Sequence, residues 1–338
     1  MTRLAIGFYH DPPIFLGEVP FDTQTRRVSF DRFAVEAIRL ELAEGLVVNA
    51  SVQGQFGFDF SAVTRSGIGA APTNHDDFES WAESVVARTM VMNAFLAFFY
   101  SRLISAEQRI MERMVISPNL TIPMERLGGP LEGGTSNAHV SHLMSSGLPG
   151  TYMIGIHPDG DRRLVGRVHA PPIRLETVRS AASDLSDVLD KFGEQGVALI
   201  DIFLRASRAF QDHNQSLSLV NYWTVAEQLI NRLWKQFQSD NASRDDVMFI
   251  DTKRRKRLND SRTFSAAVVC EILSFQGYID NDLYDDIVAV RRARNNWMHS
   301  MQKVRSNDSY IANRVCERLL EQAMGVTIYG ASQRFLHG

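Results

Sequence analysis

The sequence predicts an α+β protein, in which a mixed α/β N-terminal domain is followed by an all-α helical bundle. Three observations lead to this fold class. Short β-rich or alternating segments, bounded by Gly, Pro and Asn, are concentrated in the first half of the chain. Amphipathic patterns with apolar residues at i, i+3, i+4 and i+7 fill the second half. At 338 residues, the chain is also long enough for two domains with separate cores.

The first half is expected to contain short strands around one long helix. Residues 76–116 have a strongly apolar helical pattern, which is typical of a central helix packed by the strands or by another domain. The Gly-, Pro- and Ser-rich stretch over 117–150 predicts a long irregular connection, and strand-like pieces follow in 151–157 and 162–173. The strand-like segments before the helix are RLAIGFY (3–9), VSFDRF (28–33), LVVNASV (46–52) and QFGFDF (55–60).

The second half is predicted to be helical throughout. Mostly short links join its helices, which favours an antiparallel bundle. Pro171 and Pro172 mark the change in character, and the expected domains are a mixed one over 1–178 and a bundle over 179–338. The five amphipathic segments cover 185–210, 217–237, 265–279, 283–301 and 309–328.

Composition excludes several classes of protein. A hydrophobic fraction of 44% with 22% charged residues is typical of a soluble globular chain. The formal charge of 36 − 39 = −3 leaves no broad cationic field, so nucleic-acid binding must be local. Cys270 and Cys316 are the only cysteines and have no metal-ligand spacing. We therefore predict no disulfide framework, no metal site and no cofactor.

The chain is also expected to be cytoplasmic and without a membrane span. The opening MTRLAIGFYHDPP has too short an apolar run for a secretory signal. In the most apolar helix, Arg88 and Arg102 leave only 13 uncharged residues between them. That number is below the roughly 20 residues that a spanning helix needs.

The segment VRRARNNWMHS, residues 290–300, contains polar side chains in an otherwise apolar helix. Arg294 interrupts an apolar face that also contains Val290 and Trp297. A second stripe, at spacings of three, four and seven, contains Arg292, Asn295, Asn296 and His299. Arg294 and His299 are five residues apart, about 140° around a helix. The segment is either a satisfied polar cluster or a functional site.

An arginine on an apolar face needs an acceptor, because burying an unpaired charge is costly. Glu227, in the apolar helix over 217–237, is the expected partner of Arg294. Such a pair has two explanations that the residues alone do not separate. It is either a tether between two helices or part of a site, and the neighbouring Asn295 and His299 favour the site.

The pairing of Arg294–Asn295 with His299, in the penultimate helix of an all-α bundle whose second helix carries Glu227, resembles the HEPN family. It is most similar to the branch whose motif helix reads RN…H. The resemblance covers roughly residues 183–328. It implies a metal-independent endoribonuclease that acts as a homodimer, with the motif helices of two subunits lining one cleft. The family also implies a role in toxin–antitoxin or anti-phage systems, with a protein regulator or antitoxin as partner.

The resemblance gives each residue of the motif a role. His299 is the general base for the ribose 2′-OH or the general acid for the 5′-oxygen. Arg294 stabilises charge on the phosphorane, and Arg292 is the reserve candidate for that role. Asn295 orients the imidazole or binds phosphate. Since attack by a 2′-OH requires RNA, the implied substrate is RNA.

A basic run, TKRRKRL, lies in the link between the second and third helices and is a candidate RNA-binding patch. Its basic residues are Lys253, Arg254, Arg255, Lys256 and Arg257. The alternative is a solvated loop without a role. The acidic run at 280–286 is predicted to cap a helix rather than bind a cation, and His139 with His142 lack a third metal ligand.

Two rival hypotheses remain open at the level of sequence. In the first, the bundle is a catalytically inactive HEPN module for dimerisation, RNA binding or partner docking. In the second, activity lies in the N-terminal domain. That domain shows no assembled Ser/His/Asp, Cys/His or metal set, so its expected role is to sense or regulate.

Overall fold

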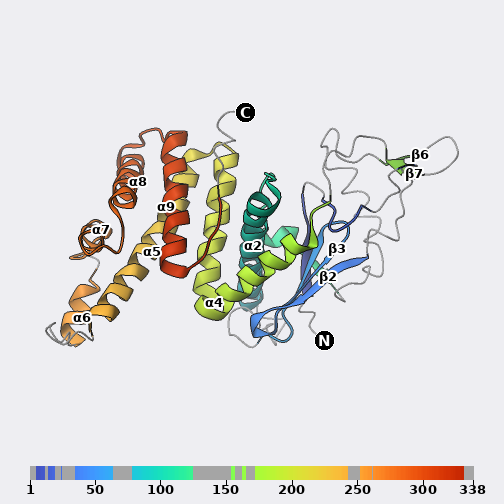
Figure 1. Cartoon of the computed structure of the whole chain (residues 1–338), viewed down its shortest axis with the longest axis horizontal. Helices are drawn as coiled ribbons and strands as arrows, with labels where there is room; N and C mark the ends of the chain where they lie inside the picture. The colour runs from blue at the N-terminus through green and yellow to red at the C-terminus, as the bar shows by residue number, and fades with distance from the viewer. Residues whose placement is uncertain are drawn as a thin grey trace. The chain divides into compact units, whose positions relative to one another are not determined.

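The computed structural model describes residues 5–11, 14–19, 24, 35–63, 78–124, 154–156, 162–164, 172–242, 252–260 and 262–330. The chain divides into two compact units, Met1–Ala198 and Leu199–Gly338. The described strands all lie in the first unit, and the described elements of the second are all helices (Figure 1). The predicted α+β class is therefore confirmed.

A five-stranded antiparallel sheet organises the first unit, in the order β2-β3-β4-β1-β5. Its inner strands β4 and β1 pair so that Phe8 lies opposite Phe56. A separate two-stranded ladder joins β6 (Ile154–Ile156) to β7 (Arg162–Leu164). The strands of the larger sheet are β1 (Ala5–Tyr9), β2 (Glu36–Glu41), β3 (Val47–Ser51), β4 (Gln55–Asp59) and β5 (Ile122–Met124).

Most of the expected strands are present. Strands β1, β3 and β4 confirm the segments at 3–9, 46–52 and 55–60, and β6 and β7 lie within the later strand-like pieces. The segment at 28–33 lies outside the described residues. Strand β2 was not predicted, and β5 lies in the stretch expected to be irregular. Two short 3₁₀ helices complete this part, η1 (Ala43–Gly45) and η2 (Pro118–Leu120).

Helix α2 (Phe78–Glu107) is the core helix of the first unit. By length and composition its Glu83–Glu107 segment could cross a membrane, but 83% of that window is buried inside the protein. The rings of Phe95 and Phe99 pack on Phe56 of β4, with centroids 5.2 and 5.6 Å apart respectively. Its apolar character therefore reflects packing against the sheet, as expected for the core of a soluble protein.

Helix α4 (Leu175–Gln211) begins in the first unit and ends in the second. It has a kink at Gly193, where φ is 57° and ψ is −146°. Before the kink, Asp184 forms a two-bonded pair with Arg102 of α2, with both N···O distances at 2.6 Å. The Ser186 hydroxyl accepts a hydrogen bond from the Ala43 N–H at 2.8 Å. These contacts hold the first half of the helix to the N-terminal unit, so the division falls after residue 198 rather than at 178.

The second unit is built around α5 (Gln215–Ala242), which packs against α7 (Ala266–Phe275), α8 (Asn281–Ser300) and α9 (Ser306–Met324) (Figure 1). The short α6 (Thr252–Leu258) is tied to α5 by a hydrogen bond from Trp234 Nε1 to the Leu258 carbonyl, at 3.0 Å. Aliphatic and aromatic side chains of α5 fill the core, including Tyr222, Leu229 and Ile230.

The directions of the helices refine the expected antiparallel bundle. The thiol of Cys316 donates to the Tyr222 carbonyl at 3.0 Å, and the Ser309 hydroxyl donates to the Gln215 carbonyl at 2.9 Å. These contacts match the early part of α9 with the early part of α5, so the two helices run parallel. Arg314 of α9 pairs instead with Asp286 of α8, and the order of such contacts makes α8 antiparallel to α9.

Candidate functional site

The motif segment forms the C-terminal half of α8. The helix begins after Asp280, whose carboxylate accepts the Leu283 N–H at 2.8 Å as an N-cap. It ends at Met301, which has left-handed backbone angles, φ 50° and ψ 28°. Its buried residues are Leu283, Ile287 and Val290, and none of the residues after Val290 is buried. The helix therefore emerges from the bundle where the motif starts.

An exposed polar stripe runs along this emerging half. Arg292, Asn296 and His299 are all exposed and stand at spacings of i, i+4 and i+7. Seven residues turn an α-helix by about 700°, so Arg292 and His299 point within about 20° of each other. In the part of the chain that the structure describes, the His299 imidazole makes no hydrogen bond.

A polar pocket of about 250 Å³ adjoins the stripe. It is formed by α8, the link after it and the first turn of α9. Arg292 and Asn296 line it from the helix, and Lys303 and Arg305 line it from the link. The remaining lining residues are Ala289, Ala293, Gln302, Val304 and Asp308.

Three cations carry the positive charge of this pocket. Neither Arg292, Lys303 nor Arg305 forms an ion pair or a side-chain hydrogen bond with any residue that the structure describes. The single carboxylate in the lining belongs to Asp308, and it accepts the Arg305 backbone N–H at 2.9 Å. Three cations and one carboxylate give the lining a formal charge of about +2. Such a pocket favours an anion.

The expected pair between Arg294 and Glu227 is not formed. Both side chains are half-buried, and no hydrogen bond or ion pair joins them in the described structure. Arg294 instead donates from Nη1 to Asn295 Oδ1 at 3.1 Å, while its buried Nε has no acceptor. The apolar periodicity gave the direction of Arg294 correctly. It did not show that the residues of α8 after Val290 are at most half-buried, or that Arg294 pairs with its neighbour Asn295 and not with Glu227.

The structure therefore brings together only part of the expected site. Arg292, the reserve candidate, shares a face with His299 and borders the pocket. Arg294 and Asn295 pair with each other on the flank of the helix, and Glu227 stays apart on α5.

Two cations at this site were not predicted. Lys303 and Arg305 belong to the link MQKVR, residues 301–305. Their alternation with apolar Val304 was the available signal, since Val304 is buried and therefore directs its neighbours outward.

The basic run at 253–257 lies in helix α6 and not in a loop. Lys253, Lys256 and Arg257 are exposed, as an RNA-binding patch requires. The side chains of Arg254 and Arg255 lie outside the described residues. The proposed role of this run stays a prediction.

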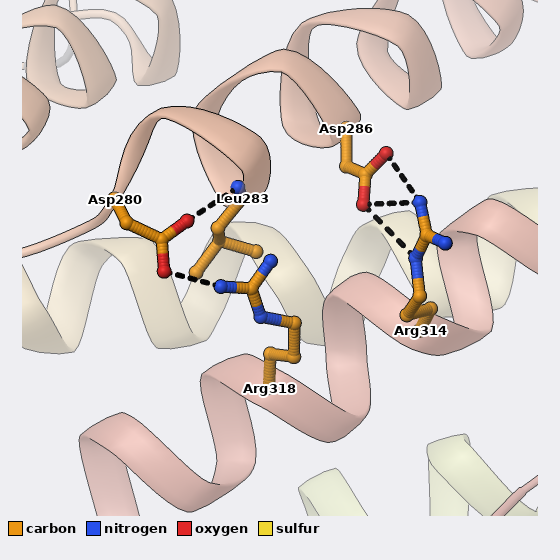
Figure 2. Close-up of polar contacts among 5 residues, drawn as sticks. All are labelled: Asp280, Leu283, Asp286, Arg314 and Arg318. Atoms are coloured by element: carbon orange, nitrogen blue, oxygen red, sulfur yellow. Dashed lines mark hydrogen bonds and ion pairs between the residues drawn. The ribbon is translucent and has the colours of Figure 1, made fainter.

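The acidic run at the start of α8 makes ion pairs with arginines of α9, as Figure 2 shows. Asp286 accepts hydrogen bonds from Arg314 Nε at 3.0 Å and from Nη2 at 2.7 Å. Asp280 caps the helix and also pairs with Arg318. The donated Leu283 N–H and, to a smaller extent, Arg318 lower the pKa of the Asp280 carboxyl. The predicted capping role is confirmed for Asp280.

Other candidates for chemistry give no site. Within the described ranges, no group of three or more His, Cys, Asp or Glu side chains could hold a metal ion. His139 and His142 lie outside those ranges. Both cysteines are buried, and burial raises the pKa of Cys270 to about 12 and that of Cys316 well above its usual value. Neither thiol is a thiolate nucleophile at neutral pH.

Comparison of the chain with models of protein families, with curated proteins and with solved structures gives no match.

Proposed function

We propose that the chain is a cytoplasmic, metal-independent endoribonuclease of HEPN type that acts on RNA as a homodimer. One observation carries this proposal. Arg292, Asn296 and His299 form an exposed stripe on α8 beside a pocket lined by three cations that have no ion pair among the described residues. A proton-transferring group thus stands next to positive charge, which is the combination that in-line phosphodiester cleavage requires.

The reaction needs only groups that this stripe supplies. His299 removes the proton from the ribose 2′-OH, whose oxygen forms a bond to phosphorus while the bond to the 5′-oxygen breaks. The 5′-oxygen then takes up a proton, from the same imidazole or from its counterpart in the second subunit. Arg292 stabilises the charge on the phosphorane, and the Asn296 amide donates to a phosphoryl oxygen. The products are a 2′,3′-cyclic phosphate and a 5′-hydroxyl.

Arg292 is the better-placed arginine in this scheme. It is exposed and shares the face of His299, whereas Arg294 stands about 140° from that histidine and is held by Asn295. The arginine role therefore moves from Arg294 to Arg292 in our proposal. Glu227 has no part in it.

The homodimer in this proposal is supported by apolar exposure beside the stripe. Met298 and Met301 expose 51% and 69% of their surfaces. A second copy of α8 packed against them would remove this area from water and bring two histidines to one cleft.

The test is cleavage of a labelled tRNA in EDTA by the wild-type chain and by His299→Ala. The wild type should leave 2′,3′-cyclic phosphate ends, and the variant should lose at least ~100-fold in rate. Because His299 is exposed and makes no hydrogen bond or ion pair within the described structure, the melting temperature should stay within about 1 °C.

Two controls make this result specific. Gln228→Ala changes an exposed polar residue on α5 of the same unit and should cleave like the wild type. A single-stranded DNA of the same sequence, which has no 2′-OH, should stay intact. Cleavage of that DNA at the same rate contradicts the mechanism. An intact tRNA after incubation with wild type would instead favour the alternative, an HEPN-like module without catalysis.

A further inference from the structure

The pocket between α8 and α9 contains more positive charge than the proposed cleavage step uses. Lys303 and Arg305 lie after the motif helix and have no role in moving protons at His299. Both side chains nevertheless line the same pocket as Arg292, from the link between α8 and α9. These two cations make no ion pair within the described residues and share the pocket with a third, so we ask what neutralises them.

Cations elsewhere on the same two helices show what is usual in this fold. Arg314 and Arg318 also line a surface pocket, together with Asp282, Asp285 and Asp286. There each arginine is paired with a carboxylate (Figure 2). Among the described residues, the cations at one end of this pair of helices thus have carboxylate partners, and Arg292, Lys303 and Arg305 at the other end have none. The missing counter-charge at the second end is best supplied by a ligand.

The dimensions and lining of the pocket limit this ligand. At about 250 Å³ it is smaller than most sites for drug-sized molecules, which occupy about 300–1,000 Å³. Its walls have no aromatic side chain on which a base could stack, and Asn296 and Gln302 add amide donors to the three cations. The first turn of α9 also begins here, and the N-terminal end of a helix favours negative charge. These features suit a phosphate group.

We propose that this pocket is a phosphate subsite for the RNA strand, in which Lys303 and Arg305 bind a backbone phosphate next to the cleaved bond. The proposal rests on the proposed function, because it takes RNA as the substrate. Lys303 and Arg305 are binding residues here and not catalytic residues. Their contribution should be the same in the ground state and in the transition state, and should therefore appear in KM and not in kcat.

The test measures binding separately from cleavage. The probe is a fluorescein-labelled 12-nucleotide 2′-O-methyl RNA, which cannot be cleaved, and its Kd is measured by anisotropy between 50 and 200 mM salt. For single strands, log K falls against log salt with a slope of about −0.7 for each phosphate contact. The double variant Lys303→Gln/Arg305→Gln should therefore have a slope smaller by about 1.4. Its Kd at low salt should rise about tenfold or more.

The matched control is Lys235→Gln, which removes one exposed cation from α5 that has no partner within the described residues. It should change neither the slope nor the Kd, whereas each single variant, Lys303→Gln or Arg305→Gln, should lower the slope by about 0.7. Both side chains are exposed and the capping hydrogen bond of Arg305 uses its backbone N–H, so folding should be preserved. If Lys235→Gln weakens RNA binding and lowers the salt slope as much as the pocket variants do, the binding is not localised to this subsite.

The outcomes separate this inference from the proposed function. If the double variant binds the oligonucleotide as the wild type does, or if the wild type does not bind it, the subsite is wrong even when tRNA is cleaved. If binding depends on Lys303 and Arg305 but tRNA stays intact, the subsite stands and the nuclease is wrong. In a second experiment, 5′-AMP is titrated into the protein and its Kd is compared with that of the oligonucleotide. Tighter binding of AMP than of the oligonucleotide, lost in the double variant, would replace the RNA strand with a free nucleotide.

Discussion

The two ends of the pair formed by α8 and α9 use the same residue types to opposite effect. At the start of α8, Asp280 and Asp286 neutralise Arg318 and Arg314 of the neighbouring helix. At its other end, Arg292, Lys303 and Arg305 surround a pocket without an ion pair among the described residues. Arg314 donates from two nitrogen atoms to the carboxylate of Asp286, which meets its need for a counter-charge. The ion pairs at this first end therefore stabilise the fold. The second end has charge available for a ligand.

Substituting one arginine at each end would test this comparison most strongly. Arg292→Ala should lower kcat/KM for RNA cleavage by ~100-fold or more and leave the melting temperature almost unchanged, because the side chain stabilises a transition state and not the fold. Arg314→Ala should do the reverse. It leaves cleavage unchanged and costs about 1 kcal/mol of unfolding free energy, a modest value because the Arg314 side chain is 48% exposed. Cleavage kinetics and urea unfolding give both quantities.

The double variant Asp286→Ala/Arg314→Ala supplies the control for the stabilising end. If the two side chains act mainly through each other, the double variant should be little less stable than either single one. A loss of cleavage in Arg314→Ala as deep as that in Arg292→Ala would contradict the distinction between the two ends.

The sequence predicted the end with the ion pairs better than the end with the cationic pocket. The capping role of Asp280 followed from an acidic run directly before a strongly periodic helix, which is a local pattern. The pocket depends on how the chain turns after that helix. Met301 adopts left-handed backbone angles that usually indicate Gly, so no residue type announced the turn that brings Lys303 and Arg305 to Arg292.

Two further differences between the predicted and the observed structure also arise from non-local packing. The apolar periodicity placed Arg294 on the apolar face of α8 but contained no information on how deeply each part of the helix is buried. The predicted pair between Arg294 and Glu227 was therefore wrong. Strand β2 (EAIRLE) lies at the edge of its sheet, where it pairs only with β3. It buries only Ile38, and one buried residue gives no visible alternation. Local patterns predicted the elements, whereas non-local packing decided which side chains meet.

Substitution of Arg294 tests, within the motif itself, whether an arginine contributes to stability or to cleavage. Its Nε is buried without an acceptor, and a buried donor without a partner destabilises a protein. Arg294→Met keeps a long side chain and removes the charge, so the unfolding free energy should rise by about 1 kcal/mol. Cleavage should stay within about threefold of the wild type, since Arg292 is the arginine that faces the substrate in our proposal. Urea unfolding and the tRNA assay measure the two effects.

The contrasting variant for this position is Arg292→Met, which makes the same chemical change on the exposed face. It should leave stability unchanged and remove most of the cleavage. If the activities of the two variants are reversed, the arginine role returns to Arg294, which would then act in the cleft of the partner subunit.

The smallest expected effect concerns the N-cap at the stabilising end and its dependence on pH. The Leu283 N–H and Arg318 lower the pKa of Asp280 in the folded chain below its unfolded value of about 3.9. The charged carboxylate therefore stabilises the fold above that pH, and this contribution is lost as the pH falls through the folded pKa. Asp280→Ala should lower the melting temperature by on the order of 2 °C at pH 7. Asp280→Asn keeps a capping oxygen, so its melting temperature should fall less than that of Asp280→Ala. The difference between the two variants separates the effect of the capping hydrogen bond from that of the charge. In calorimetry, the difference in melting temperature between the wild type and Asp280→Ala should become smaller as the pH falls from 5 to about 3. A gap that stays constant would show that the ionised carboxylate does not stabilise this end.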